Sequence, residues 1–154
     1  ATGAVGIVRR DPMAMKPFCG YNFADYFAHW LSFDKPGARL PKIFHVNWFR
    51  KGTDGKFLWP GFGDNLRVLE WILNRVDGTA AAQPTPIGHL PRAQDLNVAG
   101  LAINNDQVSE LLAVDRVGWL QEMHAIGAYL DSYGARTPEA LKGEQLRIVD
   151  ALRD

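Results

Sequence analysis

The stretch of this 154-residue chain richest in side chains suited to ligand binding runs from residue 44 to residue 65. It places seven ring side chains among glycines, a proline and charged groups: Phe44, His45, Trp48, Phe49, Phe57, Trp59 and Phe62. Aromatic residues favour strands and usually pack in a core, so an ordinary β-hairpin is one interpretation. Rings broken up by glycine and polar residues also suit the walls of a slot for a flat ligand such as a nucleobase. Residue types alone favour the packed hairpin.

The residues that follow favour the second interpretation, a slot for a flat ligand. Residues 61–65 lead directly into a helix predicted over 66–76, whose apolar residues recur at helical spacing: Leu66, Leu69, Leu73 and Val76. Asp64 or Asn65 is expected to cap this helix, and Gly78 to end it. Phe62 stands between two glycines just before the helix start, where unpaired amide donors and close backbone approach can hold a planar polar group.

This run resembles the base pocket of the GTP-dependent phosphoenolpyruvate carboxykinases. The upstream run 11–23, Asp-Pro-Met-Ala-Met-Lys-Pro-Phe-Cys-Gly-Tyr-Asn-Phe, is similar to the segment just before that pocket in the same family. The likeness is nearly continuous over 11–76 and thinner over 95–154. It implies a C-terminal portion of such an enzyme.

The resemblance also implies a division of the chain. Residues 1–10 correspond to the end of a mobile lid over the active site, and residues 11–154 to the C-terminal part of the nucleotide-binding domain. Within that part, 44–65 is the base pocket and 95–154 a helical scaffold.

The resemblance assigns roles to individual residues. Phe49, Phe57 and Phe62 are expected to sandwich or edge the guanine, with Trp48 against the base or the ribose. Asn65, together with the backbone of Phe62, Gly63 and Asp64, is expected to hydrogen-bond the base edge. Phe18 is expected beside the small substrate, with no catalytic residue in this chain. Trp59 is expected to be a packing residue.

The implied reaction converts oxaloacetate and GTP into phosphoenolpyruvate, carbon dioxide and GDP, a decarboxylation with phosphoryl transfer (a lyase of gluconeogenesis). That chemistry needs cations on the phosphates and on the enolate oxygen, supplied by Mn²⁺ and Mg²⁺ in the intact enzyme. The sequence has no Gly-x-x-x-x-Gly-Lys-Ser/Thr string and no assignable manganese ligands. We therefore expect no activity from this chain alone. Its partner would be the missing N-terminal part of the enzyme, which we expect to be a monomer when intact.

Composition limits the other kinds of function and cellular setting that are expected for this chain. Seventeen Lys and Arg balance seventeen Asp and Glu, so electrostatics give no support to nucleic-acid binding. The one cysteine, Cys19, permits no intrachain disulfide and suits a cytoplasmic setting. No apolar run reaches membrane-spanning length. The four histidines have no zinc-type spacing. Arg9 and Arg10 suit a solvated face better than a phosphate site.

The expected fold is α/β, or α+β-like: a short aromatic β-hairpin with four to five surrounding helices. Alternation predicts a strand over 42–50 that is covered on both faces, a turn at 53–56 and a return strand over 57–59. Helices are predicted from Asn22 to about residue 32, from 106, and from Asp115 to Gly134. A last helix is predicted with Thr137 as its cap and Pro138 in its first position.

The rest of the chain carries weaker signals. Residues 79–91 are expected to be irregular, residues 5–8 extended, and Met13, Met15 and Phe18 packed. Cys19 is expected to be a buried small hydrophobic residue.

Two functions of other classes remain open. One is a nucleotide-binding module without catalysis. The other is a helical interaction domain whose aromatic hairpin is core. Quenching of tryptophan fluorescence by GTP would separate a base slot from an interaction scaffold.

Overall fold

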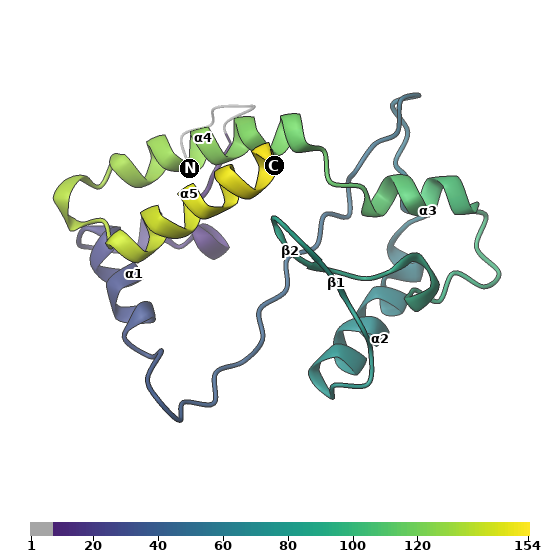
Figure 1. Ribbon diagram of the computed structural model, residues 1–154, viewed down its shortest axis with the longest axis horizontal. Helices are drawn as coiled ribbons and strands as arrows, with labels where there is room; N and C mark the ends of the chain where they lie inside the picture. The colour runs from purple at the N-terminus through teal and green to yellow at the C-terminus, as the bar shows by residue number, and fades with distance from the viewer. Residues whose placement is uncertain (1–7) are drawn as a thin grey trace. The chain divides into compact units, whose positions relative to one another are not determined.

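The computed structural model describes residues 8–154, which form two compact units (Figure 1). One unit combines residues up to Leu40 with the stretch Arg116–Asp154, and the other is Pro41–Asp115. Five α-helices and one small antiparallel sheet confirm the expected mixed fold class within the described residues. The predicted lid end and extended start fall largely on residues 1–7, which lie outside the described residues.

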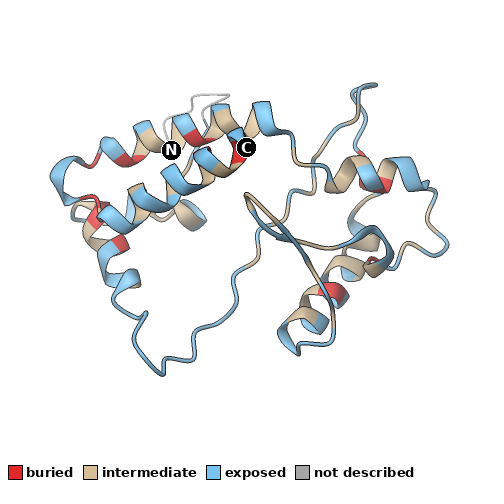
Figure 2. Ribbon diagram, in the orientation of Figure 1, coloured by how far each residue is buried: buried red, intermediate tan, exposed pale blue. Residues whose placement is uncertain are grey.

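The first unit is helical. It comprises the short 3₁₀ turns η1 (Pro12–Ala14) and η2 (Lys16–Phe18), helix α1 (Phe23–Leu31), helix α4 (Arg116–Asp131), turn η5 (Gly134–Arg136) and helix α5 (Glu139–Arg153). Helices α4 and α5 run side by side, joined through η5 (Figure 1). The core joins α1 to α4 and the turn after it, through buried residues that include Phe23, Ala24, Phe27, Leu130 and Tyr133 (Figure 2).

Local capping sets the helix starts in this unit. The side chain of Asn22 accepts a hydrogen bond from the Ala24 amide at 2.9 Å, as predicted. The predicted cap of α5 is wrong by one position, because Pro138 is the N-cap. The buried hydroxyl of Thr137 instead donates to the Leu130 carbonyl at 2.6 Å and so fastens the turn between α4 and α5.

The second unit carries the aromatic stretch. Its elements are η3 (Phe62–Asp64), α2 (Asn65–Val76), β1 (Gln83–Thr85), β2 (Gly88–Leu90), η4 (Ala93–Asp95) and α3 (Asn105–Leu112). Gly78 has a φ of +78°, and the Thr79 amide donates back to the Asn74 carbonyl, so α2 ends at the predicted glycine. A capping box of Asn104 and Gln107, which the sequence reading did not single out, starts α3.

The strand predicted over 42–50 does not form, and Ile43 is 93% exposed. Alternation specifies only where side chains point, whereas a strand also needs a neighbour along its length, and in the described chain only Arg50, at the end of this segment, has a backbone partner in another segment. The aromatic hairpin is closed by a bridge between Lys51 and Phe57 and by a hydrogen bond from the Leu58 amide to the Arg50 carbonyl. The two named strands instead pair within 83–90, a stretch that we predicted to be irregular.

Candidate functional site

The three phenylalanines assigned to the base slot are all exposed. Phe49, Phe57 and Phe62 leave 72%, 56% and 91% of their surface accessible. Phe49 and Phe57 meet across the hairpin with ring centroids 5.9 Å apart in an edge-to-face arrangement. Phe62 makes no ring contact with either one in the described chain. Rings this large are usually shielded from water, so their exposure leaves faces available to a flat partner.

The backbone of the hairpin holds Phe49 and Phe57 in place. The Asn47 side chain accepts a hydrogen bond from the Phe49 amide at 2.9 Å, and the Gly52 amide donates to the Lys56 carbonyl at 2.9 Å. A Cβ atom at Gly52 would lie 3.1 Å from the Leu58 side chain, so this position leaves little room for a larger residue. These contacts fix the rings of the hairpin arms without covering them.

Behind the exposed rings lies a more protected layer. Trp59 is 7% exposed, which confirms it as a packing residue, and its ring centroid lies 6.3 Å from that of half-buried Trp48. Its indole Nε1 also donates a hydrogen bond to Oδ1 of Asn65 at 2.9 Å. Sequence reasoning missed this bond, because nothing in the spacing of residues 59 and 65 indicates that the chain turns back between them.

Asp64 is the N-cap residue of α2, as predicted, but the side-chain capping bond is absent. Asp64 makes no side-chain capping bond; its Oδ1 accepts from Nε of Arg67 at 3.2 Å. The amides of Asp64 and Asn65 are already used, since they donate to the carbonyls of Gly61 and Phe62. The N–H groups of Phe62 and Gly63 have no partner among the described residues, so these two amides remain as donors next to the exposed Phe62 ring.

Phe18 lies in the first unit, on η2, and is 90% exposed. The prediction that Met13 and Phe18 pack is therefore wrong; Met13 is 77% exposed. The Lys16 amide donates to the Asp11 carboxylate at 3.0 Å, which ties this turn to the preceding segment, and only Met15 and Cys19 of the turn pack against the core. Cys19 is half-buried rather than buried.

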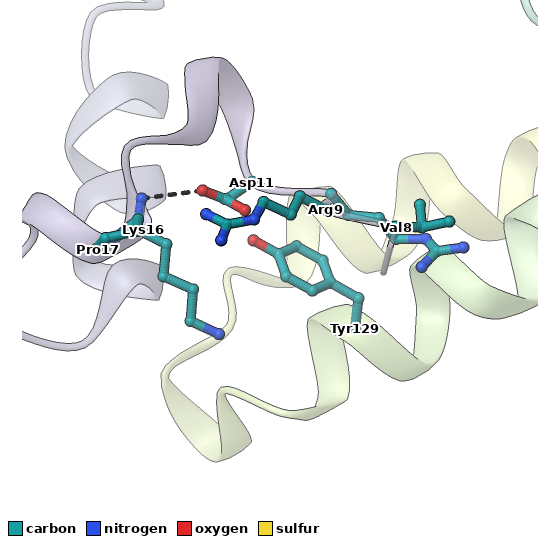
Figure 3. Close-up of a pocket in the computed structure, with 7 residues that line it drawn as sticks. Val8, Arg9, Asp11, Lys16, Pro17 and Tyr129 are labelled. Carbon is teal, nitrogen blue, oxygen red and sulfur yellow. Dashed lines mark hydrogen bonds between the residues drawn. The ribbon is translucent and has the colours of Figure 1, made fainter. Parts of the chain in front are cut away.

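The two arginines before η1 differ in their surroundings. Arg10 pairs with Glu122 through two hydrogen bonds of 3.1 Å. Arg9 lines a cavity of about 350 Å³ together with Lys16, Asp11 and Tyr129 (Figure 3). Burial raises the pKa of Tyr129 far above its ordinary value, so this phenol stays protonated. This hollow belongs to the first unit, whereas the exposed rings of residues 49–62 belong to the second.

Among residues 8–154, no three His, Cys, Asp or Glu side chains come together as a metal site. In the same part of the chain, no helix combines the length and the apolar character that crossing a membrane would require.

Exposed rings, two amides without a partner among the described residues and a side-chain amide thus occur together within residues 49–65 of the second unit. The family model for the phosphoenolpyruvate carboxykinase C-terminal P-loop domain matches residues 1–150. The chain is 53% identical to phosphoenolpyruvate carboxykinase [GTP] of Chlamydia pneumoniae, over 99% of this chain and 26% of that protein. It is 49% identical to the protein of the same name from Thermoplasma volcanium, over 94% of this chain and 24% of that protein.

The chain therefore belongs to the GTP-dependent phosphoenolpyruvate carboxykinase family and corresponds to the C-terminal part of its members. It spans about a quarter of the length of the relatives that it matches. This confirms the family resemblance that was drawn from residues 11–23 and 44–65.

Proposed function

We propose that this chain supplies the base half of the GTP site in an enzyme that converts oxaloacetate and GTP into phosphoenolpyruvate, carbon dioxide and GDP. The observation that carries the proposal is the exposure of three large rings, Phe49 and Phe57 on the hairpin and Phe62 in the turn before α2. A guanine ring stacked on such rings would cover apolar surface that the described chain leaves exposed.

In the proposed site, stacking provides affinity for the base and hydrogen bonding provides the preference for guanine. Stacking of a base on an aromatic ring contributes about 1–3 kcal/mol and tolerates any base. The preference for guanine then has to come from polar groups, and this proposal assigns it to the Asn65 side chain and the amides of Phe62 and Gly63 at the start of α2. Trp48, half-buried against Trp59, is placed by this proposal against the base or the ribose.

The remaining chemistry belongs to other parts of the protein in this proposal. The phosphate-binding loop, the ligands of Mn²⁺ and Mg²⁺ and the groups that grip oxaloacetate would come from the portion that the relatives carry beyond this match. Phe18 would border the small substrate, and residues 1–10 would form the end of the lid. The complete enzyme would be a cytoplasmic monomer. The 154-residue chain by itself would have no carboxykinase activity.

A fluorescence titration tests the proposal directly. GTP added to the full-length protein that carries this chain should quench tryptophan emission, because Trp48 lies in the proposed site. Phe62→Ala should weaken that response, whereas Phe33→Ala, which alters an exposed ring in the other unit, should not. No response to GTP would favour the helical interaction domain. A response without turnover of oxaloacetate would favour the non-catalytic nucleotide-binding module.

The origin of any activity needs a separate control. A native mass followed by a denaturing mass of the same sample shows whether a second polypeptide accompanies the 17.1 kDa chain. Turnover by a sample that contains only this chain would contradict the proposed division of the active site.

A further inference from the structure

The hydrogen bond between Trp59 and Asn65 fixes which way the Asn65 amide faces. An indole N–H can only donate, so the Asn65 atom that lies 2.9 Å from Nε1 has to be the carbonyl oxygen. The amino group, Nδ2, then points away from Trp59 and makes no hydrogen bond among the described residues. If the amide were flipped, the Asn65 amino group would face the indole N–H. Two donors would then meet, and the buried indole N–H would have no acceptor.

Both ends of this contact are held firmly. Trp59 is 7% exposed and packs against Trp48, so its indole has little freedom to turn. Asn65 is the first residue of α2, and its own amide donates to the Phe62 carbonyl. The same asparagine is thus anchored through its backbone to the residue with the most exposed ring of the slot.

We propose that Trp59 is a positioning residue for base recognition, because it holds Asn65 with Nδ2 free to donate to the C6 carbonyl of a purine. The inference rests on the proposed function and deepens it. Guanine and hypoxanthine carry an oxygen acceptor at C6, whereas adenine carries an amino group there. A fixed Nδ2 donor matches the first two bases and opposes the third. Trp59 therefore raises the affinity for 6-oxopurines relative to adenine, although it does not contact the base.

Removing the indole N–H while keeping an aromatic ring tests this role. In Trp59→Phe, the Asn65 amide is free to flip and offer its oxygen to adenine. The ratio of GTP to ATP affinity, measured by calorimetry on the full-length protein, should fall about fivefold to tenfold, the worth of one hydrogen bond. The ratio of GTP to ITP should not change, since both bases carry the C6 oxygen. For turnover, the KM for GTP should rise while kcat is kept.

Trp71 offers a matched control. It is equally buried at 5% exposed and lies in the same unit, but its indole N–H has no hydrogen-bond partner. Trp71→Phe makes the same chemical change without releasing a recognition group. It should leave the GTP to ATP ratio at the wild-type value, so a general loosening of the unit would appear equally in both variants.

A second variant keeps the test decisive if Trp59→Phe does not fold. Asn65→Asp can still accept from Trp59, but it has no N–H to offer to a base, so GTP and ITP affinity should both fall more than tenfold. If wild-type protein binds no GTP, the proposed function itself fails. If it binds GTP but Trp59→Phe keeps the wild-type GTP to ATP ratio, or Asn65→Asp keeps GTP affinity, the role of Trp59 is refuted and the proposed function survives.

Discussion

At the scale of single residues, the proposed base site contains both exposed and buried aromatic side chains. Phe62 is 91% exposed and contributes little to packing, whereas Trp59 is buried and bonded. Residues that would hold the base by stacking are therefore distinct from those that hold the pocket in shape. Substitutions at the two kinds of position should have different consequences.

Phe62→Ala should weaken GTP and ATP binding together, by about 1–3 kcal/mol, because stacking does not distinguish bases. It should change the free energy of unfolding by less than about 0.5 kcal/mol, since the ring is exposed. Calorimetric titration and urea denaturation of the full-length protein measure the two effects. A large loss of stability with unchanged nucleotide affinity would mean that Phe62 is a packing residue once the whole protein is assembled.

Asn65→Ala should weaken nucleotide binding and also lower the stability of the fold. It should weaken GTP and ITP binding by the same factor, because the group recognised is the C6 oxygen that the two bases share. It should also lower the free energy of unfolding by about 1–3 kcal/mol, because the buried indole N–H of Trp59 loses its acceptor. A selective loss of GTP over ITP would place Asn65 at the exocyclic amine instead.

At the scale of elements, caps explain where the helices begin. Asn22 accepts from the Ala24 amide and also donates from Nδ2 to the Tyr133 carbonyl at 3.3 Å, so it links the start of α1 to the turn after α4. One residue thereby fixes a helix start and a contact between segments that are distant in sequence.

Asn22→Ala should lower the free energy of unfolding by about 1–2 kcal/mol, because it removes a helix cap and an additional hydrogen bond. Asn22→Asp keeps the cap and loses only the donated bond, so it should recover most of that stability. Urea denaturation of the three proteins gives the comparison. Equal destabilisation by both substitutions would show that the bond to Tyr133, rather than the cap, matters at this position.

At the scale of the whole molecule, the apolar face of α2 is left uncovered in the described chain. Leu66, Leu69, Leu73 and Val76 lie on one side of the helix and are 43–73% exposed, while Trp71 provides its buried contact. Because the chain spans about a quarter of its relatives' length, we propose that the remainder of the same enzyme covers this face.

Leu73→Lys should therefore destabilise the full-length protein by about 2–4 kcal/mol, since it would place a charge in a covered apolar contact. Asn74→Lys introduces the same residue next to it on the other side of α2 and should be nearly neutral. Thermal denaturation of both variants provides the measurement. If Leu73→Lys is as harmless as Asn74→Lys, the face is open to solvent in the whole protein.

The sequence by itself determined the family and predicted the helices. The start of α1 and the end of α2 followed from Asn22 and Gly78 because capping and glycine geometry are local properties of the chain. The exposed rings at Phe49 and Phe62 were singled out by motif. These features depend on residues close together in sequence.

Only the tertiary structure decided which contacts form between distant residues. Residues 42–50 alternate as a strand should, but a strand needs a partner, and the pairing occurs instead at 83–90. Met13 and Phe18 are apolar but lie outside the core, because burial depends on what else packs there. The bond from Trp59 to Asn65 arises because the chain turns through Gly61, whose φ is +144°, and no local sequence rule specifies that contact.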